Sequence, residues 1–507
     1  MNISVKGVTV MDFKASFEIP PPPIHPMNIK EQVTTDVVVV GAGISGLTAA
    51  LSSAEAKAKT ILLEKGSTYH FHGLHNAAIA SRLQKQAGIK IDKDQLIHTL
   101  MEWGSYRTDQ RVIKAWADNC DKVMDWLLDM SEAAKIEVVL DPTTKSWYFP
   151  NYPLIHVFKP AFQETLAQML LSNGQARRVD YRFDTPAVRL LREGKQRVTG
   201  VIAQNAQGDY IQFNVRKAVV LCTGDYGNDR EMVRQYCWPV VNSVRCEYAP
   251  PVNTGDGHKM GMWIGAAIDD PPHCVNYFDN AVWGQEGLFN LGRQPWLWVN
   301  LQGERFMNED LPWGYEGNQL LQQPGHVAWS VWDEKWEQEV PRMKSQCCKN
   351  MGPPTYLWDP KWLSSALRRG DVLTGKTIEE LAQKMEVPVE TFKTTVARYN
   401  QLAQNGKDLD FSKHPDRLTT LEKPLLYACK MTVDYLVILS GLKINPKQQV
   451  LDTEGNVIPG LYAAGNVSGS FFANMYPTTT PGLTHSRAWT FGRLAGLSAA
   501  AEKPWRY

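Results

Sequence analysis

The eight cysteines of this 507-residue sequence include no CxxC pair and no CxxCH segment. Zinc ribbons, redox-active dithiols and c-type haem attachment use such spacings, so the cysteines point to none of them. His70, His72 and His75 have mixed loop spacing with no acid nearby, and we expect no metal site. We expect the cysteines to be reduced thiols in a cytoplasmic protein. They occupy positions 120, 222, 237, 246, 274, 347, 348 and 429.

The sequence is also without long apolar runs. No window of about 18 apolar residues occurs, which argues against a transmembrane segment. The first residues lack a charged stretch followed by an apolar core, the pattern of a secretory signal. The formal net charge is only +1, so no overall positive field favours nucleic acid. The length predicts at least two domains with a large core.

The most informative segment that is present begins at a run of four valines, residues 37–40, typical of a strand buried on both faces. Gly41, Gly43 and Gly46 follow as GxGxxG. The first glycine permits a tight turn from strand to helix. The second lets a pyrophosphate approach bare backbone, and the third lets the helix pack on the strand.

A small-residue helix at 47–56 and a second short strand at 61–63 complete this unit. Bound phosphates would lie at the N-terminus of the helix. Glu64, at the end of the second strand, lies where a carboxylate accepts hydrogen bonds from an adenosine ribose. The order of strand, glycines, helix, strand and acid is more specific than the glycines alone. It predicts a dinucleotide site.

The remaining segments suggest further elements. Four prolines at 20–23 predict an extended arm over residues 1–30, with a docking ligand for a partner as the alternative. Residues 95–135 have helical periodicity, and residues 135–215 alternate strand-like and turn-like runs. Residues 217–225 (KAVVLCTGD) predict a returning strand beside the nucleotide.

From about residue 250 to residue 425 the chain becomes rich in Trp and Pro, with mixed helix and strand patterns. Residues 253–267 predict a Gly-Asp-Gly turn that opens a helix, and a strand pair is expected around residues 302–303. The chain then returns to small residues. Residues 460–469 predict a strand with a glycine turn, and residues 490–496 (TFGRLAG) open a terminal helix.

Residues 370–377 (GDVLTGKT) formally match a P-loop. A P-loop needs a strand before its glycines, whereas the preceding WLSSALRRG is typical of a helix end. Thr377 and Glu380 instead predict a capping box for the next helix.

These segments together, in order from about residue 35 to residue 500, resemble the flavoprotein family of fumarate reductases, succinate dehydrogenases and 3-ketosteroid dehydrogenases. The matching segments are VVVVGAGISGLTAA with LLEK, HNAA, AVVLCTGDYG, NTGDGHKMG, VNLQGERFMNE, TIEELAQKM with VARYN, and GLYAAGNVSG with TFGRLAG. The resemblance implies an α/β fold in which an α+β capping domain is inserted into a Rossmann-like FAD-binding domain. We expect an arm at 1–30, an FAD-binding domain at 31–250 and 426–507, and a capping domain at 251–425.

The resemblance also implies which residues hold FAD. These are Gly41, Gly43, Ser45, Gly46, Glu64, Lys65, Asn76, Thr223, Gly224, Asp256, Gly465 and Asn466. Family members with covalent flavin carry the linking His nine residues before Asn-Ala-Ala. Ser67 occupies that position here, so we expect noncovalent FAD. The sequence has no FMN-carrying or haem domain, so a separate electron donor or acceptor is expected.

Two departures bear on the substrate. Fumarate reductases bind one substrate carboxylate with a His-Thr-Met-Gly-Gly-like segment, but Leu436 and Val437 lie where that histidine would fall. They bind another with the Arg of Ala-Asn-Arg-Leu-Gly-Gly-Asn, and here Met475 replaces it. Fumarate is therefore an improbable substrate. The ketosteroid dehydrogenases are closer, because Tyr476 matches their carbonyl-polarising tyrosine, although the following PTTTPGL loop is about two residues longer.

These resemblances imply catalytic roles. Tyr476 would stabilise charge on a substrate carbonyl oxygen; the alternative is a tyrosine packed in the core. Arg293 would deliver a proton unless it is a surface salt-bridge arginine, and Tyr315 is the rival acid or base if neighbours lower its phenol pKa. Arg487 and His485, near the terminal helix, would face either the flavin or its phosphates.

The expected activity is reduction of an activated C=C bond, in an enone or other α,β-unsaturated carbonyl compound with an apolar or aromatic body. The alternative within this class is a 3-ketosteroid dehydrogenase. A noncatalytic flavoprotein or electron-transfer subunit is the alternative outside it.

Overall fold

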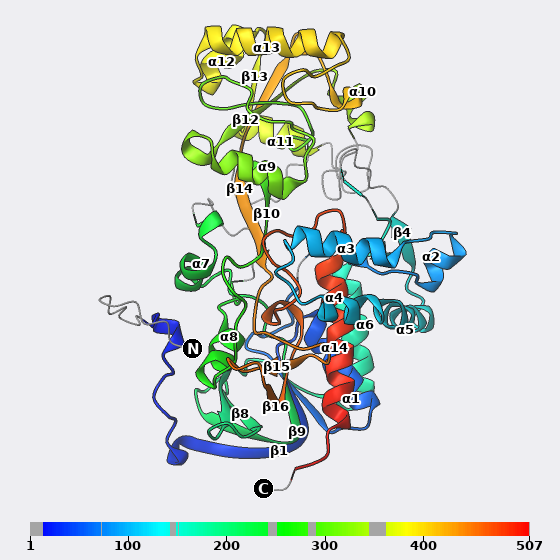
Figure 1. The fold of residues 1–507 in the computed structure, drawn as a ribbon, viewed down its shortest axis with the longest axis vertical. Helices are drawn as coiled ribbons and strands as arrows, with labels where there is room; N and C mark the ends of the chain where they lie inside the picture. Colours follow the sequence, from blue (N-terminus) through cyan, green and yellow to red (C-terminus); the bar gives the residue numbers. More distant parts are fainter. Residues whose placement is uncertain are drawn as a thin grey trace.

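The structure is a computed structural model that describes residues 14–71, 73–141, 149–150, 152–241, 251–281, 291–343 and 361–505. Two large sheets lie one above the other along the long axis (Figure 1). Among the described residues, no helix has the length and apolar character needed to cross a membrane.

The first sheet has a parallel core. Its strands, in spatial order, are β15 (Gln449–Leu451), β16 (Val457–Ala463), β9 (Tyr210–Leu221), β1 (Ile29–Val40), β2 (Thr60–Leu63) and β6 (Asp180–Arg182). β7 (Ala187–Arg192) and β8 (Val198–Gln204) continue it from β9 by antiparallel pairing. β1 pairs in parallel with β2 and β9, and β9 with β16. The returning strand expected at 217–225 is therefore confirmed as the C-terminal part of β9.

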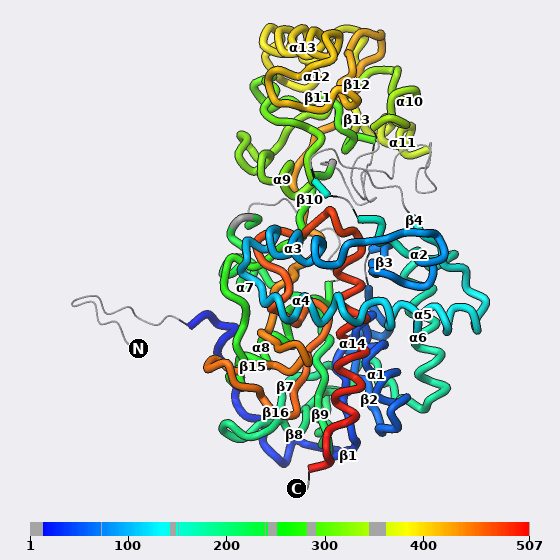
Figure 2. The backbone as a smooth tube through the Cα atoms, turned by 45° about the vertical axis from the view of Figure 1, so that its right-hand side comes forward, coloured from blue at the N-terminus to red at the C-terminus, as the bar shows by residue number. Residues whose placement is uncertain are grey.

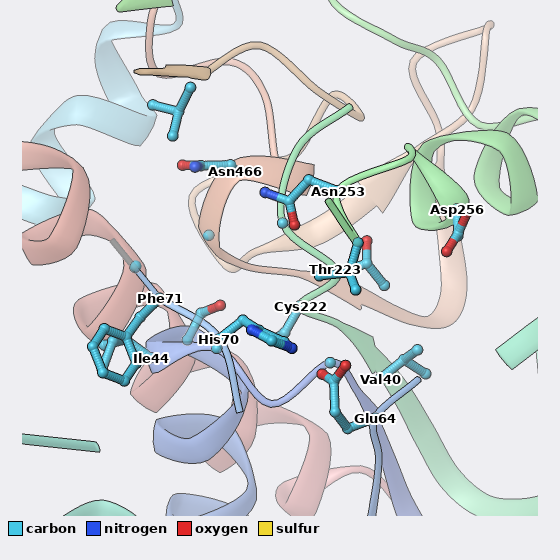
Figure 3. A pocket seen from close by; sticks show the side chains of 18 of the residues that line it. Val40, Ile44, Glu64, His70, Phe71, Cys222, Thr223, Asn253, Asp256 and Asn466 are labelled. Carbon is cyan, nitrogen blue, oxygen red and sulfur yellow. The ribbon is translucent and has the colours of Figure 1, made fainter. Parts of the chain in front are cut away.

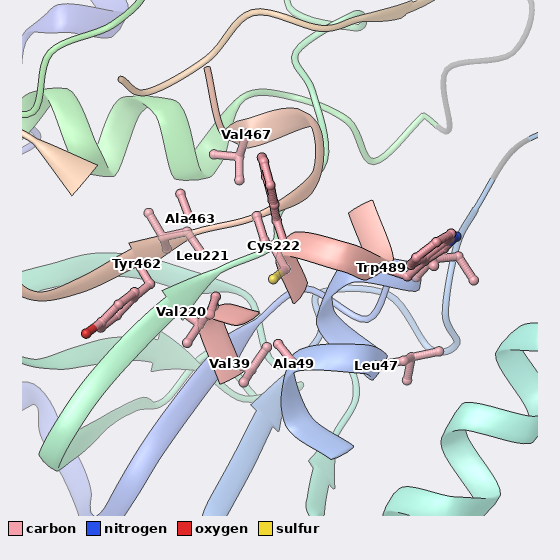
Figure 4. Packing of buried hydrophobic residues seen from close by; sticks show 14 of the residues in the cluster. Val39, Leu47, Ala49, Val220, Leu221, Cys222, Tyr462, Ala463, Val467 and Trp489 are labelled. Carbon is pink, nitrogen blue, oxygen red and sulfur yellow. The ribbon is translucent and has the colours of Figure 1, made fainter. Parts of the chain in front are cut away.

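Helices α1 (Ile44–Glu55) and α14 (Leu483–Ala501) run side by side against this sheet (Figure 2). Their axes approach closely because α14 carries glycines at the contact. A Cβ on Gly492 would lie 2.5 Å from the Ser45 carbonyl oxygen, and one on Gly496 would lie 2.3 Å from that of Ala49. Figure 4 shows the apolar side chains that fill the core between strands and helices. Both ends of the chain thus build one domain.

The terminal helix is longer than predicted. It begins at Leu483 rather than at Thr490, and Gly482 precedes it with a left-handed φ of 81°. Residues TTTPGLTH before the expected start have little helix propensity. Burial stabilises this first turn instead, because Leu483, Ser486 and Arg487 are all buried.

The second sheet is antiparallel, in the order β10 (Val275–Ala281), β14 (Leu426–Ile438), β12 (Ala328–Asp333) and β11 (Leu297–Val299), with β13 (Val372–Gly375) also paired to β14. Around it lie α9 (Trp313–Leu321), α10 (Trp336–Glu339), α11 (Lys361–Arg369), α12 (Ile378–Met385) and α13 (Val389–Gln404). This is the inserted α+β unit, and the predicted fold class is confirmed.

Two local expectations need correction. The boundary expected at residue 425 falls immediately before β14, which belongs to the second sheet and extends down to the first domain. The strand pair expected at 302–303 is reduced to one bridge between Val299 and Arg305. The Asn300 side chain accepts hydrogen bonds from the backbone N–H of Gln302 and Glu304 and closes a tight turn there.

The other helices are α2 (Arg82–Gln86), α3 (Lys93–Trp103), α4 (Gln110–Ala117), α5 (Cys120–Ala133), α6 (Gln163–Ala176), α7 (Arg230–Tyr236) and α8 (Asp256–Trp263). A small sheet is formed by β3 (Asn76–Ala77), β5 (Ile155–Phe158) and β4 (Val138–Asp141). The helical periodicity at 95–135 corresponds to α3, α4 and α5, whereas α6 was missed within the strand-like stretch.

Residues 370–377 do not form a P-loop. Helix α11 precedes them and strand β13 lies within the glycine segment rather than before it. Thr377 Oγ1 accepts from the Glu380 backbone N–H at 3.1 Å, while the Glu380 carboxylate accepts from the Lys376 N–H at 2.7 Å. The segment is a strand that ends in a helix cap.

The proline arm lies on the first domain. Arg189 on β7 donates hydrogen bonds to the carbonyl oxygens of Pro21 and Pro22. Phe17 is buried against Tyr236, and Trp263 Nε1 donates to the Phe17 carbonyl at 2.9 Å. The described part of the arm is thus bound within its own chain.

Candidate active site

A cavity of about 1150 Å³, including solvent space at its mouth, opens where β1, β9 and β16 end (Figure 3). Ten of the twelve residues expected to hold FAD line it. They are Gly41, Gly43, Ser45, Glu64, Lys65, Thr223, Gly224, Asp256, Gly465 and Asn466. These residues come from segments between positions 41 and 466, and the fold brings them to one wall.

The three glycines of the first turn serve different purposes. Gly41 has φ of 104°, and a Cβ there would lie 2.3 Å from the Cys222 carbonyl oxygen. A Cβ on Gly46 would lie 1.8 Å from the Gly41 carbonyl oxygen. Both glycines are therefore required by the packing of the chain itself. Gly46 does not line the cavity.

Gly43 differs because its φ is an ordinary −71°. A Cβ there would meet only the His70 carbonyl oxygen at 3.4 Å among the described residues, and Gly43 lines the cavity. The chain could thus accept a side chain at 43, whereas a phosphate bound at the start of α1 could not. This bare backbone fits a dinucleotide.

We predict that Gly43→Ala folds normally but binds FAD about 5- to 150-fold more weakly, since an extra methyl in a packed site costs roughly 1–3 kcal/mol. Flavin titration into the apoprotein measures the loss. Gly46→Ala is the matched control, because its Cβ collides with backbone and should lower the unfolding temperature. If Gly43→Ala and the unaltered protein bind flavin with equal affinity, the bound dinucleotide does not lie against the backbone of Gly43.

Glu64 is fixed by the backbone around it. Its carboxylate accepts from the N–H of Ala42 at 2.7 Å and of Gly66 at 2.8 Å. Each carboxylate oxygen accepts more than one hydrogen bond, so the group retains capacity toward the cavity. It can hold a ribose hydroxyl while keeping the turn closed.

Lys65 and Asp256 form an ion pair of 2.7 Å on the cavity wall. Thr254 Oγ1 accepts from Lys65 Nζ at 2.8 Å and donates to Asp256 at 2.9 Å. Asp256 begins α8, so the pair connects that helix to the end of β2. Each of these two charges on the cavity wall is therefore balanced by the other.

Asn76, in contrast, does not line the cavity. It is fully buried beneath the start of α14, where its Oδ1 accepts from Trp489 Nε1 at 3.2 Å. A Cβ on Gly482 would lie 2.9 Å from the Asn76 backbone nitrogen. The residue supports the N-terminus of α14 from behind.

His485 and Arg487 lie in different positions relative to the cavity. His485 lines the cavity, and its Nδ1 lies 2.8 Å from both the His75 carbonyl oxygen and Gln163 Nε2. Arg487 is buried one layer behind and donates to Asn466 Oδ1 at 3.0 Å. Burial lowers the pKa of its guanidinium to about 10. Arg487 therefore acts on the cavity through Asn466.

Other lining residues include His70 and Phe71, from the loop after Lys65 that we expect to pass along the flavin, and Cys222 and Asn253. Asn253 belongs to the Gly-Asp-Gly turn, and Cys222 ends the returning strand. Proximity to those segments was the only available signal.

The three catalytic candidates lie outside this cavity. Tyr476 is buried against Phe472, and its hydroxyl donates to the Thr480 carbonyl at 3.5 Å. This length is at the outer limit for a hydrogen bond.

Arg293 is fully buried, so the surface alternative is wrong. Its Nε lies 3.2 Å from an Asp279 carboxylate oxygen, and its guanidinium lies 5.7 Å from the Trp313 ring. Arg293 and Asp279 thus form a buried ion pair in the second domain.

Tyr315 stacks on Trp103 at 4.9 Å and thus links α9 to α3. Burial raises its phenol pKa above the usual value, whereas the proposed acid–base role assumed that neighbours lower it. A raised pKa favours a neutral phenol that donates a proton rather than accepts one.

The start of α9 brings these candidates together. Trp313 contacts Arg293, Tyr315 is two residues further on, and a Cβ on Gly314 would lie 2.9 Å from Met475 Sδ. Tyr476 follows Met475. The start of α9 thus lies against Arg293 and against Met475, the neighbour of Tyr476, whereas Leu436 and Val437 of β14 line the cavity.

Comparison with known proteins agrees with this geometry: a parallel nucleotide-binding sheet, a glycine turn and an inserted second sheet. The FAD binding domain family matches residues 36–483, and the chain belongs to it. The chain is 28% identical to the vinyl phenol reductase of Lactiplantibacillus plantarum, over 94% of this chain and 98% of that one. It is 28% identical to a 3-oxosteroid 1-dehydrogenase of Mycolicibacterium smegmatis over 60% of this chain and 56% of that protein.

The open conformation of a flavocytochrome c3 fumarate reductase has the same fold. Its TM-score is 0.72 at 22% identity, with 98% of this chain and 84% of that chain covered.

Proposed function

We propose that this FAD-dependent oxidoreductase reduces an activated C=C bond in an enone or other α,β-unsaturated carbonyl compound with an apolar or aromatic body. The observation that carries the proposal is the apolar wall at Leu436 and Val437, where fumarate reductases have a carboxylate-binding histidine. The related vinyl phenol reductase, by its name, acts on an aromatic alkene. The second candidate function is that of a 3-ketosteroid dehydrogenase, which introduces a double bond into the steroid ring. Tyr476 and the similarity to a 3-oxosteroid 1-dehydrogenase support it.

In this proposal the cofactor is held by the ten cavity residues and supported from behind by Gly46 and Asn76. When bound, reduced FAD supplies a hydride to the alkene. Tyr476 would donate its hydroxyl hydrogen bond to the substrate carbonyl oxygen, where negative charge grows.

The proton for the neighbouring carbon would come from Arg293 or Tyr315. Tyr315 is half-buried at the domain junction, and its raised pKa keeps its proton available at neutral pH. Arg293 would need to exchange its contact with Asp279 for one with substrate. We propose that residues of the second sheet and its helices close over the substrate.

We further propose that FAD is noncovalent, that electrons are exchanged with a separate protein or small-molecule carrier, and that the protein is cytoplasmic. Trichloroacetic acid should release the flavin into the supernatant, because Ser67 offers no linking imidazole. Absorbance of the supernatant and in-gel fluorescence of the pellet measure this. Fluorescence that remains with the polypeptide would contradict noncovalent binding.

The activity is tested by anaerobic photoreduction of the purified flavoprotein followed by a screen of alkenes. Rapid flavin reoxidation by enones supports the reductase, whereas reoxidation by vinyl phenols alone would indicate a C=C reductase whose substrate needs no carbonyl. Bleaching of oxidised flavin by saturated 3-ketosteroids, without reoxidation by enones, would favour the dehydrogenase. Slow reaction with every alkene and ketosteroid would refute both.

A further inference from the structure

A carboxyl group that the proposed chemistry does not use lies directly behind the cavity wall. Asp225 follows Thr223 and Gly224 after β9 and is fully buried. Its Oδ1 accepts from the Gly227 backbone N–H at 2.7 Å, and its Oδ2 accepts from Asn253 Nδ2 at 3.3 Å. No salt bridge to Asp225 is found within the described part of the chain. A buried carboxylate held only by neutral donors is sensitive to any charge that arrives nearby.

Two amides connect Asp225 to the cavity. Asn253 and Asn466 both line it, and their side chains extend toward it in Figure 3. Asn253 donates to the Asp225 carboxylate, whereas Asn466 accepts from Arg487 through its Oδ1 and lowers the pKa of Asp225 from close by. An amide nitrogen carries two hydrogens, so one bonded to Asp225 leaves another for a group in the cavity. Asp225 thus orients the Asn253 amide.

Tyr226 and Cys237, the titratable side chains whose pKa values Asp225 affects, are neutral. Tyr226 is fully buried, and burial raises its pKa well above the usual value. Burial likewise raises the pKa of Cys237 to about 12. Arg487, from α14, is charged and donates to Asn466 rather than to Asp225. Burial, opposed by the hydrogen bonds from Gly227 and the two amides, raises the pKa of Asp225 itself to about 7.

We propose that Asp225 is a positioning residue that takes up one proton when two electrons enter the FAD held in the cavity. The electrons come from the external donor, and the proton comes from solvent and forms an O–H bond on the Asp225 carboxylate. Reoxidation releases it. The negative charge gained in the cavity disfavours a second negative charge behind its wall. This inference rests on FAD binding alone and not on the substrate proposed above.

The test is the midpoint potential of the bound flavin as a function of pH, with dithionite as reductant and redox dyes as indicators. One additional proton per two electrons changes the equilibrium constant tenfold per pH unit, or about 30 mV per pH unit. Above about pH 7 the unaltered protein should therefore show a slope steeper by this amount than Asp225→Asn. Equal slopes in the two proteins would overturn the proposal.

Asp269→Asn is the matched control. Asp269 has a pKa that burial raises to about 6, and it accepts from the backbone N–H of Gly441 at 3.1 Å and Ser470 at 2.9 Å. It does not line the cavity or bond an amide that does, so its variant should keep the steep slope. If both variants lose the steep slope of midpoint potential against pH, any buried carboxyl group produces it. That result would refute a specific role of Asp225.

If Asp225→Asn fails to bind flavin, the reduced-minus-oxidised infrared spectrum of the unaltered protein at pH 8 decides. A new protonated-carboxyl band on reduction supports the proposal, and its absence overturns it. Neither measurement uses an alkene. A protein that titrates as expected yet reduces no alkene would refute the proposed substrate class and leave this inference intact.

Discussion

Tyr476→Phe should lower the rate of substrate-dependent flavin reoxidation by about 10²–10³-fold, the usual effect of removing one donor to a developing oxyanion. The ring packs on Phe472, and the hydroxyl donates to the Thr480 carbonyl at 3.5 Å, the outer limit for a hydrogen bond. Phenylalanine keeps the ring and its packing. Folding and FAD content should therefore change little. Stopped-flow reoxidation of photoreduced protein measures the chemical step, and a loss there with unchanged substrate affinity indicates an interaction made mainly in the transition state.

Tyr315→Phe separates a proton donor from an oxyanion donor. Because burial raises the pKa of this phenol, the unaltered protein should lose rate only at alkaline pH, as the proton donor ionises. Tyr315→Phe should lack this alkaline fall and should change the solvent isotope effect. Near wild-type reoxidation by Tyr476→Phe at every pH would make Tyr476 a wall residue and remove the ketosteroid-dehydrogenase-like interpretation of its loop.

Fumarate should be reduced with a kcat/KM about 10²–10⁴-fold below that of the best enone. A buried charge that loses one partner costs roughly 3–5 kcal/mol, and the cavity presents Leu436 where a carboxylate would need a donor. Steady-state assays with photoreduced or dye-reduced enzyme compare the two substrates.

The double variant Leu436→His and Met475→Arg tests the same point by gain of function. In the double variant the kcat/KM for fumarate should approach the kcat/KM for the enone. Met475→Leu, which adds no charge, should leave the ratio of the two values unchanged. Efficient fumarate reduction by the unaltered protein would show that these two positions are wrongly matched to the carboxylate-binding groups.

The residues of this cavity could be selected from the sequence because the first part of it is local in sequence. Strand, glycine turn, helix and Glu64 lie within 30 residues, and their spacing fixes their geometry. Asp225 and Arg487 could not be assigned in this way, since their effect on the cavity depends on Asn253 and Asn466, which come from distant segments.

In the second domain, too, some features depend on contacts between distant segments and could not be predicted from the sequence. The apolar run of β14 is long enough for a strand in either sheet, and only its pairing with β10, β12 and β13 places it in the second. Arg293 could not be distinguished from a surface arginine until Asp279 was found beside it.

The contact between α1 and α14 also determines when this protein can mature. Ser53 on α1 donates a hydrogen bond to the carbonyl of Gly496, 443 residues further along the chain. At 5–20 residues per second, the ribosome needs roughly 20–90 s to make that intervening stretch. Throughout that time α1 can pack on β1, β2 and α6, but the side that α14 covers in the folded protein lacks this helix. We therefore expect transient packing or chaperones to cover that side of the nascent chain. The part of the cavity wall that α14 supplies forms only after this helix has left the ribosome.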